Sequence, residues 1–198
     1  MVGACAPAPR HHGGLWAPRR PPEANVLPPP ELHRGSLLAD TEAVQALVDA
    51  MEEPPLVLGH SYGGSVITGL MGAVYLVYLA AFVPAEGESA ASLGGSTRLL
   101  ASSIVHDGDG LTHVDSAAAV ELFYADAPVE RATWAASLLR PQKPGCGRGV
   151  PQRQSWRNTP STYVICTQER AVEPDLKMPV PAPDHANSRR AKVSYTSG

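Results

Sequence analysis

The sequence predicts an α/β fold, with a mostly parallel sheet covered by helices on both faces. Two observations support this prediction. Segments with helical and strand patterns alternate from residue 37 to residue 82, and a short apolar run at 55–58 leads directly into the motif GHSYG at 59–63. Helices and strands that alternate along a chain usually form parallel strands, with the helices packed over the sheet.

The first half of the chain is expected to hold four elements. They are a helix at 40–51, a strand at 55–58, a helix that begins near Gly64 and a strand at 74–82. The first helix has apolar residues at helical spacing, with Asp40 or Thr41 as its N-cap. The last strand is rich in branched and aromatic residues, as central parallel strands are, and Pro84 ends it.

The second half is expected to hold a helical lid at about 87–155 and a further buried strand. The elements are a loop at 106–110, helices at 116–124 and 128–139, and a strand at 162–167. Asp126 is a candidate N-cap for the second of these helices. Neither helix carries an obvious catalytic set, so we interpret them as a cover for the site.

Proline is concentrated at both ends of the chain. The sequence contains 20 prolines among 198 residues, and eight of them precede Ser36. We therefore expect a poorly ordered N-terminal segment at 1–36, one α/β domain at 37–176 and a poorly ordered tail at 177–198. A chain of this length suffices for one such domain.

The net charge and the cysteine content indicate which binding partners and which cellular compartment to expect. The formal net charge of −3 gives no reason to expect nucleic acid or an anionic membrane as a partner. Cys5, Cys146 and Cys166 are too few and too scattered for a disulfide framework or a paired metal motif, so we expect a cytoplasmic protein. The first residues lack the apolar core of a signal peptide. The sequence leaves a homodimer open.

One uncharged run has two interpretations. No Asp, Glu, Lys or Arg lies between Glu53 and Glu86, and the stretch 64–84 is long enough to span a bilayer. The alternative is a buried helix followed by a buried strand, which we favour because Gly69 and Gly72 interrupt the run. It also lacks the flanking Lys or Arg clusters that anchor a membrane span.

The motif Gly59-His60-Ser61-Tyr62-Gly63 indicates a nucleophilic serine. A serine that attacks a carbonyl must stand clear of the backbone at a sharp turn from strand to helix, and such a turn is expected to require glycine two residues before and after it. The amide of the next residue, Tyr62, can donate to a developing oxyanion. His60 is either a pocket-lining residue or a core histidine. The competing interpretation of the whole motif is a plain glycine-rich turn.

A carboxylate follows the strand expected at 162–167. Glu169 lies just past its carboxyl end, and functional groups collect at the carboxyl ends of strands in open parallel sheets. A serine hydrolase keeps there the acid that orients its histidine. The alternative is a surface glutamate paired with Arg170.

With these residues in view, the chain resembles the α/β-hydrolase superfamily, in the esterase branch that includes plant methyl-ester esterases, hydroxynitrile lyases and bacterial relatives. The likeness covers about residues 37–176. It rests on the segments DTEAVQALVDA, LVLGHSYGGSVITG, LVYLAAFVPAEGES, ELFYAD and WRNTPSTYVICTQERAVEP.

The resemblance implies roles for individual residues. Ser61 matches the nucleophile, and the Tyr62 amide matches one arm of the oxyanion hole, with Ala4 as the candidate for the second. Glu169 stands where relatives usually have aspartate. His185, in the pair Asp184-His185, matches the general base, although relatives place that histidine nearly thirty residues past the acid, after one more helix and strand. The alternative for His185 is a histidine in a frayed tail.

These observations lead to two functional hypotheses. The first is a serine hydrolase that cleaves a small carboxylic ester and needs neither a metal nor an organic cofactor. The second is a hydrolase-fold protein that lacks a working histidine and is inactive or binds a small apolar ligand. The sequence does not separate an esterase from a lyase.

Overall fold

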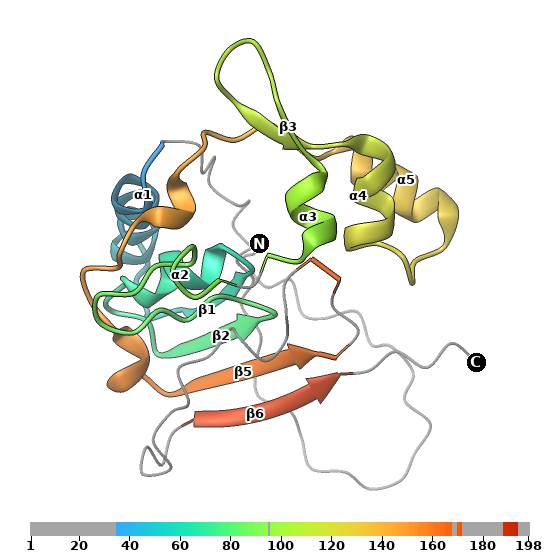
Figure 1. Ribbon diagram of the computed structural model, residues 1–198. Helices are drawn as coiled ribbons and strands as arrows, with labels where there is room; N and C mark the ends of the chain where they lie inside the picture. The colour runs from blue at the N-terminus through green and yellow to red at the C-terminus, as the bar shows by residue number, and fades with distance from the viewer. Residues whose placement is uncertain (1–34, 95, 168–169, 172–187, 194–198) are drawn as a thin grey trace, which may run out of the picture.

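The computed structural model describes residues 35–94, 96–167, 170–171 and 188–193. Its main sheet has four strands, all parallel, in the order β1-β2-β5-β6 (Figure 1). The strands are β1 (Leu56–His60), β2 (Tyr75–Leu79), β5 (Ser161–Cys166) and β6 (Ser188–Val193). The predicted mostly parallel sheet is therefore confirmed.

The register brings the carboxyl ends of the strands to one edge of the sheet. His60 at the end of β1 pairs with Leu79 of β2, and Leu79 pairs in turn with Val164 of β5. Residues that follow β1, β2 and β5 in the sequence therefore leave the sheet on the same side. This is the edge at which parallel sheets carry their functional groups.

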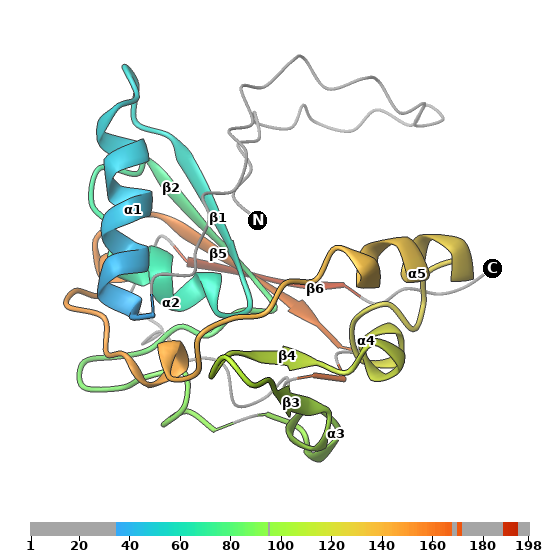
Figure 2. The same ribbon diagram turned by 90° about the horizontal axis from the view of Figure 1, so that it is seen from above.

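Two helices lie together on one face of this sheet (Figure 2): α1 (Leu37–Asp49) and α2 (Gly63–Thr68). Helix α1 begins three residues before the predicted start, because the Ser36 hydroxyl caps it by accepting a hydrogen bond from the Ala39 amide. Asp40 is consequently not the N-cap. It lies inside the first turn, on the buried face with Leu37, Val44 and Val48.

The uncharged run is a helix and a strand. Helix α2 ends at Thr68, and strand β2 begins at Tyr75 after a loop with Gly72 at φ 79°. Both elements contribute to the main core. Its buried members come from α1, β1, α2, β2, β5 and the segments that follow α2 and β2: Leu37, Val44, Val48, Val57, Val66, Ile67, Leu70, Leu76, Tyr78, Ala81, Val83 and Tyr163. None of the helices in the described residues is long and apolar enough to cross a membrane.

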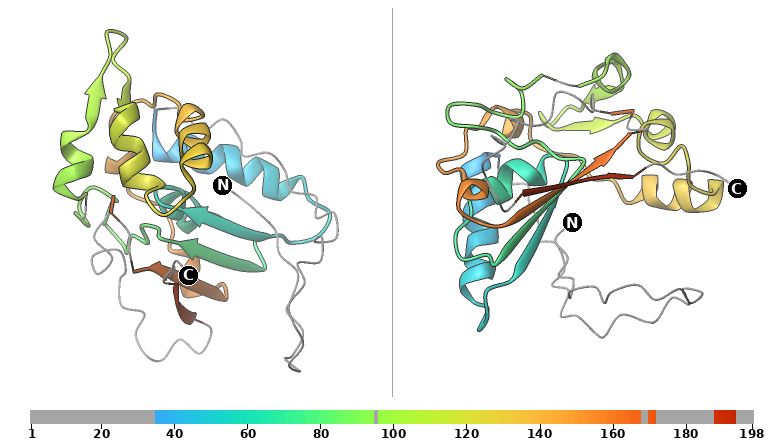
Figure 3. Two further views of the ribbon diagram at one scale, coloured as in Figure 1. Left: turned by 90° about the vertical axis from the view of Figure 1, so that its right-hand side faces the viewer. Right: turned by 90° about the horizontal axis from the view of Figure 1, so that it is seen from below.

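A second region lies beyond the carboxyl ends of the strands (Figures 1 and 3). It comprises α3 (Arg98–Ser102), the antiparallel pair β3 (Ile104–His106) and β4 (Thr112–Val114), α4 (Ser116–Phe123) and α5 (Val129–Ser137). The two helices predicted at 116–124 and 128–139 are confirmed, although Asp126 does not cap α5, which Pro128 precedes. Two short 3₁₀ turns, Cys146–Arg148 and Ser155–Arg157, lead back to β5.

Strand β6 lies inside the range 177–198, for which the sequence predicted no regular element. Its residues, SRRAKV, pair in parallel register with β5. The expected segment at 1–36 lies almost entirely outside the described residues, as does the rest of the tail.

Candidate active site

Ser61 lies at a sharp turn between strand β1 and helix α2. The strand ends at His60, Ser61 has φ 53°, and Tyr62 has returned to helical angles at φ −54° and ψ −32°. Serine rarely adopts a positive φ, so this conformation is strained and must be held by its surroundings. The Ser61 residue is half-buried, neither enclosed in the core nor part of a continuing helix. The sequence predicted this turn and its position.

The Ser61 backbone is held on both sides by hydrogen bonds. Its amide donates to the Leu79 carbonyl at 3.3 Å, and its carbonyl accepts from the amides of Gly64 at 3.0 Å and Phe82 at 3.1 Å. The turn is therefore tied to the end of β2 and to the segment that follows it. These bonds offset the cost of the positive φ.

Two glycines of the turn are required by close backbone contact, and only one of them is a glycine that the motif predicts. A Cβ atom on Gly59 would lie 2.5 Å from the Gly63 carbonyl oxygen, as the prediction requires. A Cβ on Gly63 would have no atom within 4 Å, so the prediction is wrong there. The tight position is instead Gly64, where a Cβ would lie 2.4 Å from the Phe82 oxygen and 2.6 Å from the Ala81 Cβ.

A second strained residue lies at the end of the neighbouring strand. Ala80 follows β2 with φ 41°, and besides Ser61 it is the only non-glycine residue with positive φ in the described part of the chain. Its amide donates to the Val164 carbonyl of β5 at 2.9 Å. The bend at Ala80 leads the chain into Ala81 and Phe82, which contact the turn at 59–64, hereafter called the elbow. No sequence pattern indicates this bend, because alanine has no preference for positive φ.

The Tyr62 side chain reaches back to helix α1. Its hydroxyl donates to Oδ2 of Asp40 at 2.9 Å, and Asp40 is only 1% exposed. Burial, followed by the hydrogen bond to Asp40 and the Asp40 charge, raises the pKa of Tyr62 well above its usual value. The Tyr62 amide, by contrast, donates to no backbone oxygen of the described residues. Such an amide beside a nucleophile is available to an oxyanion.

The sequence offered Asp40 only as a helix cap. A signal was nevertheless present, because Leu37, Asp40, Val44 and Val48 follow one another at intervals of three and four residues. This spacing puts the carboxyl on the apolar face of the helix.

Of the other predicted site residues, only His60 lies in the described part of the chain. His60 is exposed at the end of β1, beside Ser61, so it is not a core histidine. Ala4, Glu169 and His185 lie outside the described residues. Arg170, the alternative partner of Glu169, has its guanidinium 3.8 Å from the carboxylate of Glu121, with both side chains more than half exposed.

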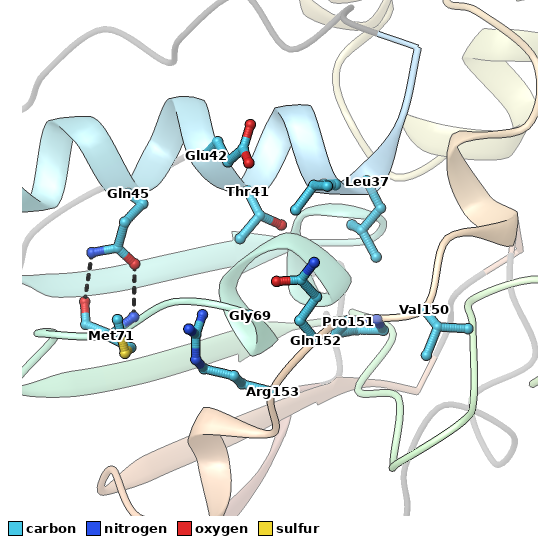
Figure 4. Close-up of a pocket in the computed structure, with 11 residues that line it drawn as sticks. Leu37, Thr41, Glu42, Gln45, Gly69, Met71, Val150, Pro151, Gln152 and Arg153 are labelled. Atoms are coloured by element: carbon cyan, nitrogen blue, oxygen red, sulfur yellow. Dashed lines mark hydrogen bonds between the residues drawn. The ribbon is translucent and has the colours of Figure 1, made fainter.

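A groove of about 440 Å³ lies between α1 and the segment 150–153 (Figure 4). Its wall is held by Gln45, whose amide oxygen accepts from the Met71 amide at 2.8 Å and whose amide nitrogen donates to the Met71 carbonyl at 3.1 Å. The lining includes Gly69, which follows the last residue of α2. Ser61 precedes the other end of this helix and is not among the lining residues. The groove is therefore separate from Ser61.

The described residues contain no group of three or more His, Cys, Asp or Glu side chains arranged to hold a metal ion. The chemistry available at the elbow is that of a hydroxyl beside an unused backbone amide. Such a pair suits nucleophilic attack on a carbonyl.

Comparison with known proteins places this geometry in a family. No curated protein matches the chain. Solved structures with a similar fold include a pyrethroid hydrolase from Sphingobium faniae JZ-2, with TM-score 0.62 and 20% identity over 80% of this chain and 69% of that one. Polyneuridine aldehyde esterase matches with TM-score 0.59 and 13% identity over 80% and 71%. The methylesterase MES16 from Arabidopsis matches with TM-score 0.55 and 14% identity over 80% and 68%.

The model of the family described as "Alpha/beta hydrolase family" matches residues 3–194, nearly the whole chain. The predicted resemblance is confirmed, and the chain belongs to the alpha/beta hydrolase family.

Proposed function

We propose that this protein is a serine hydrolase that cleaves a small carboxylic ester with Ser61 as its nucleophile. One observation carries the proposal: Ser61 is held with φ 53° at the carboxyl end of β1, half-buried, next to a Tyr62 amide that no backbone oxygen of the described residues uses. The strain supports a functional role, because strained non-glycine residues cluster at active sites. The similar structures include proteins named as esterases and hydrolases, which makes ester cleavage the first reaction to test.

The proposed reaction has two halves. The Ser61 hydroxyl attacks the ester carbonyl, a histidine accepts its proton, and the tetrahedral oxyanion is bound by the amides of Tyr62 and Ala4. The alkoxy group leaves with a proton from that histidine, and an acyl-enzyme remains. Water, activated by the same histidine, then releases the carboxylic acid and restores Ser61.

His185 is our candidate for the base, and Glu169 is the candidate that orients it. Strand β5 ends at Cys166, on the same edge of the sheet as Ser61, and Glu169 follows three residues later. His60, exposed beside the nucleophile, is the candidate for the wall of the substrate pocket. The cycle needs no metal or organic cofactor.

A second candidate function rests on the direction of strand β6. The register sets Ser188, its first residue, level with Ser161, Leu76 and Val57, four residues before Ser61 along β1. The chain therefore enters β6 at the end of the sheet away from Ser61, and His185 precedes Ser188 by three residues. This order favours a hydrolase-fold protein in which His185 is not a working base, and which binds a small apolar molecule.

A fluorophosphonate label and turnover of p-nitrophenyl acetate separate the two candidates. For the hydrolase we expect the label on Ser61 in the full chain, no label in Ser61→Ala, and a loss of turnover on the order of 10⁴-fold in His185→Ala. A folded protein that takes no label contradicts the hydrolase. Labelling with turnover that survives His185→Ala retains the nucleophile and rejects His185 as the base.

A further inference from the structure

A buried carboxyl group lies behind the elbow. Asp40 belongs to the first turn of α1, is 1% exposed and accepts the Tyr62 hydroxyl at 2.9 Å. Burying a carboxyl group among apolar residues is costly unless hydrogen bonds satisfy it. An aspartate there brings no packing advantage over the leucine or valine found at the neighbouring buried positions of α1, so its contacts with the elbow suggest why it is present.

Tyr62 connects Asp40 to the turn itself. Its carbonyl accepts hydrogen bonds from the amides of Ser65 at 2.9 Å and Val66 at 3.4 Å in α2, while its hydroxyl is bound by Asp40 in α1. Both ends of the residue are thus held by different helices. The Tyr62 amide directly follows Ser61 and donates to no backbone oxygen of the described residues, whereas the carbonyl and the hydroxyl of Tyr62 are both hydrogen-bonded.

Cys146 lies close to the same pair, and its thiol interacts with the Tyr62 hydroxyl. Burial, followed by the Asp40 charge, raises the pKa of the Cys146 thiol. The thiol therefore stays protonated and uncharged at neutral pH. The strong charge-assisted hydrogen bond at this point is the one from Tyr62 to Asp40.

We propose that Asp40 is a positioning residue that fixes, through the Tyr62 hydroxyl, the backbone amide that binds the oxyanion. The inference rests on the proposed function, because it concerns the Tyr62 amide that binds the oxyanion in the proposed reaction. Donors that stabilise an oxyanion act only when they are held in place before the reaction, and small displacements reduce the rate strongly. An anchor on the side chain of Tyr62 restrains the same residue whose amide must be aimed.

Four single variants test the anchor in the full chain. Tyr62→Phe removes the hydroxyl and retains the amide. Asp40→Ala removes the acceptor, whereas Asp40→Asn retains an acceptor oxygen. Tyr75→Phe is the matched control, because it removes another half-buried tyrosine hydroxyl, bonded to Thr162 Oγ1 at 2.9 Å, at a site remote from the elbow.

Hydrogen–deuterium exchange of the elbow peptide 59–68 is the first measurement, with α4 as the internal reference. We expect elbow amides to exchange about 10-fold faster in Tyr62→Phe and Asp40→Ala, and near the wild-type rate in Asp40→Asn and Tyr75→Phe, because exchange follows local opening. Exchange in α4 should be unchanged. If the elbow amides of Tyr62→Phe exchange at the rate of the wild type or of Tyr75→Phe, Asp40 does not hold the turn through the Tyr62 hydroxyl. This result overturns the proposal whether or not Asp40→Ala folds.

Ester turnover is the second measurement. For Tyr62→Phe we expect kcat to fall about 10-fold with KM within about 2-fold, since misaimed donors weaken transition-state binding more than substrate binding. Tyr75→Phe should retain both constants. An unchanged kcat in Tyr62→Phe overturns the positioning role. If the wild type itself neither turns over nor labels, the proposed hydrolase fails, and the exchange measurement alone decides the anchor.

Discussion

The elbow at 59–64 and the region at 87–155, which the sequence predicts to be a lid, are held by different kinds of contact. In the elbow, backbone approaches backbone so closely that a Cβ on Gly64 would lie 2.4 Å from the Phe82 oxygen. In the region at 87–155, side chains pack around Leu122, and large apolar groups stay at the surface, with Trp134 63% exposed. Backbone contacts cannot be relieved by a change of rotamer, whereas side-chain contacts can. Ser61 is therefore placed by the rigid region, whereas the side-chain packing at 87–155 can adjust.

The largest effect is expected from Gly64→Ala, tested against Gly63→Ala. The first variant drives a methyl group into the Phe82 backbone and should lower the free energy of unfolding by about 3 kcal/mol. It should also reduce Ser61 labelling, because the Phe82 amide holds the Ser61 carbonyl. The second variant meets no atom within 4 Å and should change the free energy of unfolding by less than about 0.5 kcal/mol. Urea denaturation measures both.

Equal losses in the two glycine variants would show that the elbow is not set by this backbone contact. Labelling that survives Gly64→Ala in a folded protein would show that the turn does not depend on the segment after β2.

Substitutions in the region 87–155 should lower the free energy of unfolding only where the replaced side chain is buried. Leu122 is 3% exposed, and Leu122→Ala should cost about 2 kcal/mol through the lost burial and the cavity left behind. Trp134 is a larger side chain, yet Trp134→Ala should cost less than about 0.5 kcal/mol, because most of it is exposed. Thermal unfolding compares them. A greater cost for Trp134→Ala would indicate that another surface covers α5.

Local patterns explain why much of the fold was predictable from the sequence. The order of α1, β1, α2, β2, α4, α5 and β5 follows from apolar periodicity, and the position of Ser61 follows from one motif. Strands β3 and β4 were missed because three residues each are too few to show a period. Strand β6 was missed because SRRAKV is charged and lacks the apolar pattern of a buried strand.

The supports of the elbow were harder to predict than the serine. The tight contact of Gly64 is made with Phe82, and the hydroxyl of Tyr62 is bound by Asp40, a residue of another helix. Both contacts join segments about 20 residues apart, so their distances depend on how the helices and strands pack. A motif locates the candidate serine, and tertiary packing determines what holds it.

Alkaline pH should loosen the elbow through Tyr62. The folded-state pKa of Tyr62 is raised, by burial first and then by Asp40, above the unfolded value of about 10. Its contribution to stability is therefore complete below pH 10 and is lost as the pH rises above that value. The pKa values of Tyr78 and Cys146 are raised as well, but both residues are present in the wild type and in the Tyr62→Phe variant that are compared below.

The test is the free energy of unfolding of the wild type and of Tyr62→Phe at pH 9 and pH 11. The wild type should lose more stability over this interval, by less than about 1 kcal/mol, because Tyr62 is only half-buried and solvent screens the linkage. Identical pH dependence in the two proteins would contradict the raised pKa.

The smallest effect is expected from Ser65→Ala, and it has the opposite sign. Ser65 lies in α2 at 1% exposure, and its hydroxyl finds no hydrogen-bond partner among the described residues. Alanine removes this unsatisfied group and is a better helix former, so the free energy of unfolding should rise by about 0.5 kcal/mol. Ser155→Ala is the control, because the Ser155 hydroxyl donates to the Thr68 carbonyl at 2.8 Å and its loss should destabilise. A loss of stability in Ser65→Ala would mean that its hydroxyl has a partner, and that side-chain hydrogen bonds support the elbow from within α2 as well as from α1.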